Sequence, residues 1–116
     1  MIIGEKNMIY QDNRVIKVLK QRLPNELKSI VKKIIVYGSR VSGYATEDSD
    51  LDIIILVENK TAKIEKQLED IVYEVMWEFN FTPIISLKVF SESHFLDAID
   101  RGFSFYKNVS RNGLAV

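Results

Sequence analysis

The feature that most constrains this chain is a run of five branched apolar residues, Ile53 to Val57, directly preceded by Asp50 and Asp52. A run of that length without polar interruption predicts an inner β-strand that is covered on both faces. Residues two apart on a strand point to the same face, so the two carboxylates are expected side by side. Charges held in such a place cost free energy unless something compensates them.

Helical and strand patterns alternate on either side of this run. Apolar residues three and four apart predict a long helix from Thr61 to Phe79 with a charged opposite face. β-branched runs predict two more strands, over 33–37 and 83–90. Helices are expected in four other places, namely after a cap at Asp12 or Asn13, from Pro24, within 40–45 and after a cap at Ser91. This order indicates a single domain over residues 1–116, of the α/β or α+β class, with a small sheet of about three strands covered by helices.

The charge balance restricts the partners. Lys plus Arg equals Asp plus Glu at 16 each, and no basic stripe of the kind that binds a long nucleic acid is evident. No apolar run approaches the roughly 20 residues that span a bilayer, and the first residues lack the pattern of a signal peptide. We therefore expect a cytoplasmic protein without a membrane segment and without a long nucleic-acid partner.

Two short motifs carry chemistry. Gly38 and Ser39 follow the predicted strand 33–37, where a residue without a Cβ lets backbone approach a ligand and free amides can hold an anion. The carboxylates of Asp50 and Asp52 suit Mg²⁺ or Mn²⁺, which bring phosphate oxygens into a site. Each motif alone is unspecific, since Asp-x-Asp is usually a strand edge and Gly-Ser usually a turn. Together they provide what nucleotidyl transfer requires.

The string GSRVSGYATEDSDLDIIILV, residues 38–57, resembles the signature of the DNA polymerase β-like nucleotidyltransferase superfamily. The length and the order of elements resemble its minimal nucleotidyltransferase (MNT) branch. The resemblance implies a mixed sheet with helices on one side, and transfer of a nucleoside monophosphate, with AMP expected, from an NTP such as ATP to a hydroxyl acceptor. Minimal members are often antitoxins paired with a helical HEPN-domain toxin, so a protein partner of that kind is expected as well.

The same resemblance assigns roles to single residues. Gly38 and Ser39 would hold the triphosphate, while Asp50 and Asp52 would bind Mg²⁺ or Mn²⁺ and serve as the catalytic carboxylates. Arg40 lies where it could steady a phosphate and join the nucleotide-binding residues. The alternative interpretation of Arg40 is an ordinary surface side chain.

One departure from the family pattern concerns a third carboxylate. Active members usually carry it on the strand after the long helix, but residues 83–90 contain no acid. A period of two puts Ser86 and Lys88 on one face, and Ser86 stands at the expected position, where a neutral hydroxyl is a poor base. Three hypotheses follow: an MNT-type nucleotidyltransferase, a catalytically degenerate module of that fold that neutralises a partner without turnover, and an unrelated α/β domain with a coincidental Asp-x-Asp.

Two features near the end of the chain admit simple interpretations. Phe103, Phe105 and Tyr106 form an aromatic segment after Gly102. It either folds back over the sheet or makes an apolar patch that meets another chain, which leaves a homo-oligomer open. His94, the single histidine, is expected to be solvated or to pack within its helix.

Overall fold

The computed structural model describes residues 10–42 and 48–116, whose strands form one four-stranded sheet. In chain order the elements are α1 (Tyr10–Arg22), α2 (Asn25–Lys28), β1 (Val31–Tyr37), α3 (Ser39–Ser42), β2 (Leu51–Val57), α4 (Ala62–Glu78), β3 (Ile85–Ser91), α5 (Glu92–Asp100), α6 (Ser104–Asn112) and β4 (Leu114–Ala115). The strand order is β3-β2-β1-β4, with β1 antiparallel to β2 and β4 and with β2 parallel to β3. The sheet is therefore mixed, as predicted.

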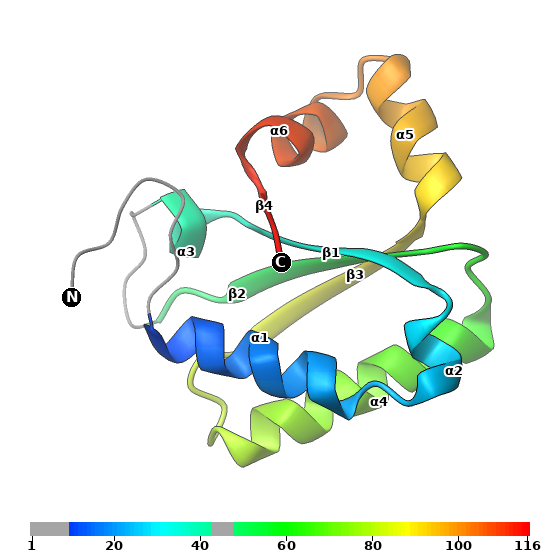
Figure 1. Cartoon of the computed structure of the whole chain (residues 1–116). Helices are drawn as coiled ribbons and strands as arrows, with labels where there is room; N and C mark the ends of the chain where they lie inside the picture. Colours follow the sequence, from blue (N-terminus) through cyan, green and yellow to red (C-terminus); the bar gives the residue numbers. More distant parts are fainter. Residues whose placement is uncertain (1–9, 43–47) are drawn as a thin grey trace.

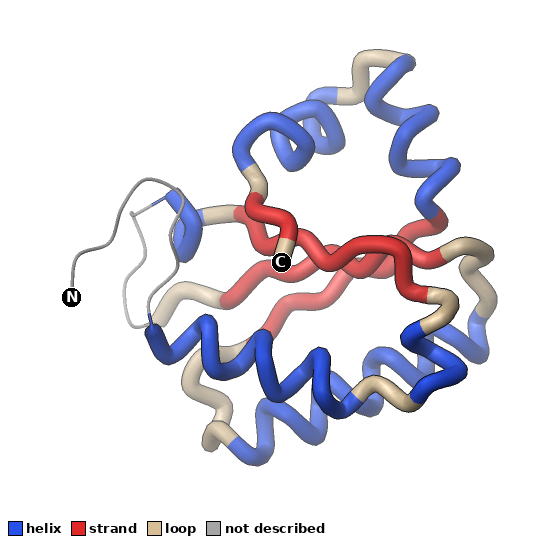
Figure 2. Tube along the Cα trace, viewed as in Figure 1, coloured by secondary structure: helices blue, strands red, loops and turns tan. Residues whose placement is uncertain are grey.

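Helices cover both faces of the sheet. Figures 1 and 2 show α1, α2 and α4 below the sheet and α5 and α6 above it. A large apolar cluster joins the lower face to α1 and α4, with Leu19, Ile53 and Leu68 among its members. A smaller cluster on the other face joins Ile54 to Phe95 and other buried residues. The expectation of helices on one side only is wrong, because the second face of β1 and β2 is apolar too and has to be covered.

β2 is the inner strand that its sequence predicts. β1 and β3 pair with it on either side, and each of its side chains except that of Asp52 is buried. The connection from β2 to β3 runs through α4, so these two strands lie parallel. The exception at Asp52 places one half-buried carboxylate on an otherwise apolar strand.

The predicted cap at Ser91 is confirmed, Thr61 caps α4 in the same way, and the predicted cap at Asp12 is wrong. The hydroxyl of Thr61 accepts a hydrogen bond from Ile64 N at 3.1 Å, and that of Ser91 accepts one from His94 N at 3.2 Å. Asp12 does not cap α1, which already begins at Tyr10. Its side chain is completely buried instead, so it needs a partner inside the domain.

The aromatic segment near the end of the chain folds back over the sheet as α6. The ring of Tyr106 packs against Phe90 and Phe95, with centroids 5.4 and 5.7 Å away. The chain then adds the two-residue strand β4 beside β1. The sheet thus has four strands rather than the three expected, because β4 is too short to leave a pattern in the sequence.

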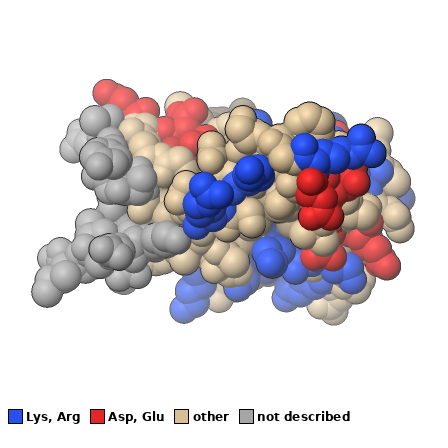
Figure 3. Space-filling model, turned by 90° about the horizontal axis from the view of Figure 1, so that it is seen from above, with Lys and Arg blue, Asp and Glu red and all other residues tan. Residues whose placement is uncertain are grey.

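The surface has no continuous basic band on the face that Figure 3 presents, where acidic and basic side chains alternate with neutral ones. Among the residues that the structure describes, no helix is long and apolar enough to cross a membrane.

We expect Ile54→Ala to lower the free energy of unfolding by about 2–5 kcal/mol, because it opens a cavity at a fully buried position in β2. Ile84→Ala is the matched control, since that isoleucine is 54% exposed. Its effect should stay within about 0.5 kcal/mol. Urea denaturation of both variants measures the difference, and equal losses would contradict the assigned burial.

Candidate active site

Asp52 lies in a row of polar side chains that crosses three strands. Its Cα is paired with that of Tyr37 on β1 and with that of Ser86 on β3. These positions share the face of the sheet that α5 and α6 cover. Lys88 lies two residues further along β3, and therefore on the same face.

Gly38 brings the turn after β1 against this carboxylate. Its φ of 84° lies in the left-handed region, which residues with a side chain adopt at a cost. A Cβ at this position would overlap Oδ2 of Asp52 and lie 3.4 Å from its Cγ. Glycine is thus required twice, by the backbone conformation and by the close approach of Asp52.

The surroundings of Asp52 on balance oppose its ionisation. Partial burial raises the pKa of the Asp52 carboxyl above its ordinary value, the negative charge of Asp50 raises it further, and Lys88 lowers it in part. The pKa of the Tyr37 hydroxyl is also raised, mainly by burial, with Lys88 opposing the shift and Asp52 adding to it. A cation bound between Asp50 and Asp52 would relieve this repulsion.

Lys88 is a member of the site that the sequence interpretation missed. Its positive charge lies close enough to the Tyr37 hydroxyl and to the Asp52 carboxyl to lower the pKa of each in part. The period of two had already placed Lys88 beside Ser86 on one face of β3. That spacing is the signal in the sequence that places a cation on the face of Asp52, two residues beyond Ser86.

Arg40 is buried beside the site, where it pairs with Asp12. Its Nε donates to Oδ2 of Asp12 at 2.8 Å, and its Nη2 donates to Oδ1 at 3.0 Å, with both side chains buried. Its Nη1 donates to the carbonyl of Ser49 at 2.9 Å. One guanidinium therefore connects α1, α3 and the segment that leads to Asp50. This geometry gives Arg40 a positioning role and contradicts the interpretation of Arg40 as an ordinary surface side chain, while its contact with a phosphate stays a prediction.

The remaining expected site residues lie at the same end of the sheet. Ser39 is the first residue of α3, directly after Gly38, and Asp50 is exposed directly before β2. Figure 1 shows α3 and the start of β2 next to each other. Within residues 10–42 and 48–116, no group of three or more His, Cys, Asp or Glu side chains is placed to hold a metal ion. The described part of the site thus provides a carboxylate pair without a third acid.

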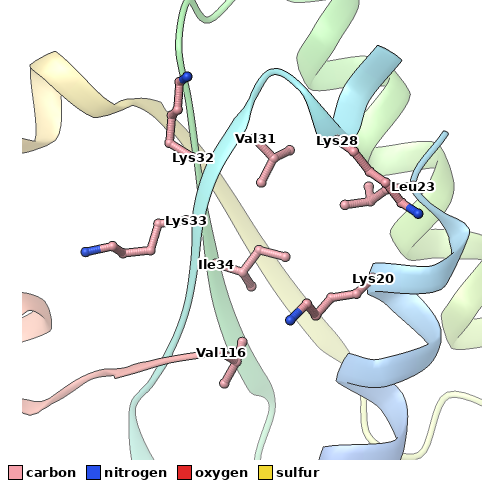
Figure 4. Close-up of a pocket in the computed structure, with 8 residues that line it drawn as sticks. All are labelled: Lys20, Leu23, Lys28, Val31, Lys32, Lys33, Ile34 and Val116. Carbon is pink, nitrogen blue, oxygen red and sulfur yellow. The ribbon is translucent and has the colours of Figure 1, made fainter. Parts of the chain in front are cut away.

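Away from the Gly38 turn, a hollow of about 390 Å³ lies between α1 and β1 and is lined in part by lysines. Figure 4 shows its lining: Lys20, Leu23, Lys28, Val31, Lys32, Lys33, Ile34 and Val116. The side chain of Lys20 points from α1 toward Ile34 and Val116, whereas those of Lys32 and Lys33 point away from Ile34 and that of Lys28 lies beside Leu23. Four amino groups spread in this way do not form a focused anion site, so the active-site candidate stays at Gly38 and Asp52.

Comparison with known proteins agrees with this arrangement. The sequence profile of the nucleotidyltransferase domain matches residues 13–109, which include every residue of the candidate site. The chain belongs to the nucleotidyltransferase domain family. It is also 32% identical, over 89 residues, to a protein of Methanocaldococcus jannaschii named "Putative protein adenylyltransferase MJ0141", with 74% of this chain and 89% of that protein covered. Nucleotidyl transfer is therefore the chemistry of the family to which this chain belongs.

We expect Asp12→Ala to lower the free energy of unfolding by about 3–5 kcal/mol, because it leaves the buried charge of Arg40 without its carboxylate. The double variant Asp12→Leu/Arg40→Met should recover much of this loss, since it removes both charges. Asp70→Ala is the control, because it breaks an exposed ion pair with Lys66 and should cost less than about 1 kcal/mol. Thermal and urea unfolding compare the variants; an Asp12→Ala protein as stable as Asp70→Ala would contradict the buried pair.

The raised pKa of Asp52 also predicts how stability varies with pH. The folded protein keeps this proton to a higher pH than the unfolded chain, so ionisation of Asp52 lowers stability as the pH rises. Without metal, Asp52→Asn should therefore melt at a higher temperature than the parent protein near neutral pH. The difference should close below about pH 4, where the carboxyl is protonated in both states. Calorimetric melting over this range tests it, and a less stable variant at neutral pH would contradict it.

Proposed function

We propose that this protein is an MNT-type nucleotidyltransferase that transfers a nucleoside monophosphate, AMP in the first instance, from an NTP to a hydroxyl group. The observation that carries the proposal is the approach of the Asp52 carboxylate to Gly38, with the charge of Asp50 near enough to raise the pKa of Asp52. It joins the two motifs, which are 12 residues apart in the sequence, into one place. Gly38 and Ser39 hold the triphosphate, and Asp50 and Asp52 hold the metal.

The residues present suit one Mg²⁺ or Mn²⁺ ion. Two repelling carboxylates provide hard oxygen ligands of the kind these ions prefer. Such an ion, when bound, neutralises charge on the phosphates and orients them for displacement. Lys88 contributes a positive charge on the same face, two residues beyond Ser86, which stands where the family pattern has a third carboxylate. We therefore propose a single-metal arrangement, in which Lys88 adds charge that a second ion would otherwise supply.

The proposed reaction is an in-line displacement at the α-phosphorus. The acceptor oxygen forms a bond to that phosphorus, the bond to the bridging oxygen breaks, and pyrophosphate leaves with its electron pair. The proton of the acceptor hydroxyl passes to solvent, because the neutral Ser86 opposite Asp52 is a poor base. Gly38 and Ser39 bind the phosphates. Arg40, through its bonds to Asp12 and to the carbonyl of Ser49, holds the Gly38 turn close to the segment before Asp50.

A hydroxyl on another protein is the proposed acceptor, and the cytoplasm is the proposed compartment. The relative from Methanocaldococcus jannaschii is named as a protein adenylyltransferase, which supports a protein target for this chain. An antitoxin that modifies a helical HEPN-type toxin would combine this chemistry with the MNT-like size of the domain. The charge balance of the chain agrees with a protein partner rather than a long nucleic acid.

The residues that β3 contributes to the candidate site favour a second candidate function. With Ser86 and Lys88 there and no acid, the domain could bind a nucleotide and a partner without turning the nucleotide over. Such a catalytically degenerate module would neutralise its partner by contact alone. The two candidates make the same binding prediction and differ only in product.

The experiment incubates the protein with Mg²⁺, ATP labelled at the α-phosphate and a candidate partner protein of the HEPN type. Transfer predicts label on the partner together with released pyrophosphate. Asp50→Asn and Asp52→Asn should abolish both and weaken Mg²⁺-dependent nucleotide binding at least about tenfold, or 1.4 kcal/mol. Asp100→Asn, on the exposed end of α5, is the matched control and should behave as the parent protein.

Calorimetry with Mg²⁺ and a non-hydrolysable ATP analogue separates the outcomes. Binding without label transfer favours the degenerate module. Binding that both Asn variants leave unchanged contradicts both candidates, because the carboxylate pair would then play no part in holding metal or nucleotide.

A further inference from the structure

A pocket lies beside Gly38, between the end of β1 and α6. Its volume is about 380 Å³, and its lining consists of Tyr37, Gly38, Phe105, Asn108, Val109 and Asn112. Gly38 is shared with the proposed phosphate site, since the carboxylate of Asp52 also lies against it. A ligand held at the Gly38 turn can therefore extend into this pocket without a break.

Aromatic rings form one part of the lining. The rings of Tyr37 and Phe105 meet edge to face, with centroids 5.7 Å apart and an interplanar angle of 87°. Phe105 in turn meets the ring of Tyr106 at 5.2 Å, and Tyr106 packs on α5 and β3. The pocket rings are thus held in place by the second apolar cluster. Such rings offer faces on which a planar heterocycle stacks.

The side-chain amides of Asn108 and Asn112 form another part of the pocket lining. Phe105, Asn108, Val109 and Asn112 are spaced three, one and three residues apart, so they share one face of α6. Val109 is buried and anchors this face to the sheet. An asparagine amide offers a donor and an acceptor side by side, which matches the exocyclic amine and N7 of adenine. The same edge of guanine presents two acceptors, which an amide matches less well.

We propose that this pocket is the nucleobase subsite of the protein, and that it prefers adenine. The inference rests on the proposed function, which places the triphosphate at Gly38 and Ser39. Stacking on the ring of Phe105 provides affinity for a base, and the amides of Asn108 and Asn112 provide the preference among bases. Neither contribution acts on the phosphates, so the subsite can be tested apart from the carboxylate pair.

The test measures two ligands by calorimetry in the presence of Mg²⁺: ATP and inorganic tripolyphosphate, which has no base. For Asn108→Ala/Asn112→Ala we expect ATP to bind about 10-fold more weakly, as the loss of one good pair of base contacts implies, while tripolyphosphate binds unchanged. The parent protein should prefer ATP to GTP, and the double variant should lose this preference. Asn59→Ala, in the exposed segment after β2, is the matched control and should change neither ligand.

Stacking is tested by a second matched pair. Phe105→Ala should weaken ATP by a similar factor, whereas Phe103→Ala should not, because Phe103 is 55% exposed and does not line the pocket. Circular dichroism confirms that each variant keeps its helices. If both Asn substitutions and Phe105→Ala leave ATP binding unchanged, the subsite is overturned and the carboxylate site stands. Equal losses for ATP and tripolyphosphate overturn it too, since the pocket would then act on the phosphates.

Two further outcomes complete the test. A parent protein that binds tripolyphosphate and ATP equally well has no base subsite, and the pocket would then be free for the acceptor side chain of a partner. A parent protein that binds neither ligand contradicts the proposed function itself, and the subsite with it.

Discussion

Asp12 and Arg40 place two opposite charges inside the domain, where α1, α3 and the segment before β2 meet. Buried charges of this kind are costly unless both partners are present in good geometry, and here the carboxylate accepts two hydrogen bonds from one guanidinium. The pair does not touch the proposed reaction. It fixes the distance between the Gly38 turn and the approach to Asp50, and so a site made from two separate motifs depends on a residue of the first helix.

Much of the fold follows from patterns that local sequence can carry. The apolar run of β2, the helical stripe of α4 and the cap at Ser91 each reflect a periodicity or a side chain within a few residues. The features that were missed depend on partners far along the chain. β4 exists only because Leu114 and Ala115 pair with β1, and Asp12 is interpretable only beside Arg40, 28 residues away. Helices on both faces likewise follow from which side chains of β1 and β2 remain uncovered, and this requires the assembled sheet.

The candidate site, too, combines residues that local sequence patterns indicate with one that only the assembled sheet brings in. Gly38, Ser39, Asp50 and Asp52 were identifiable because their spacing is local, whereas Lys88 enters through the register of β3 on β2. That register sets the charge balance of the site. A third carboxylate on β3 would add negative charge beside Asp52, whereas Lys88, two residues beyond Ser86, offsets part of the effect of Asp50 on the pKa of Asp52. The pattern of the family and the chemistry of this chain therefore differ at one strand.

The pairing of β4 with β1 has a consequence for the order in which the protein becomes competent. Leu114 lies opposite Val36, and the preceding helix supplies the far wall of the pocket beside Gly38. During synthesis the Gly38 turn and strand β2, with Asp52, leave the ribosome long before residues 104–116. A nascent chain that ends before α6 would thus carry the turn proposed to hold the phosphates without the wall of the pocket proposed to hold the nucleobase. In the proposed function, the base subsite therefore forms only once α6 and β4 have docked on β1.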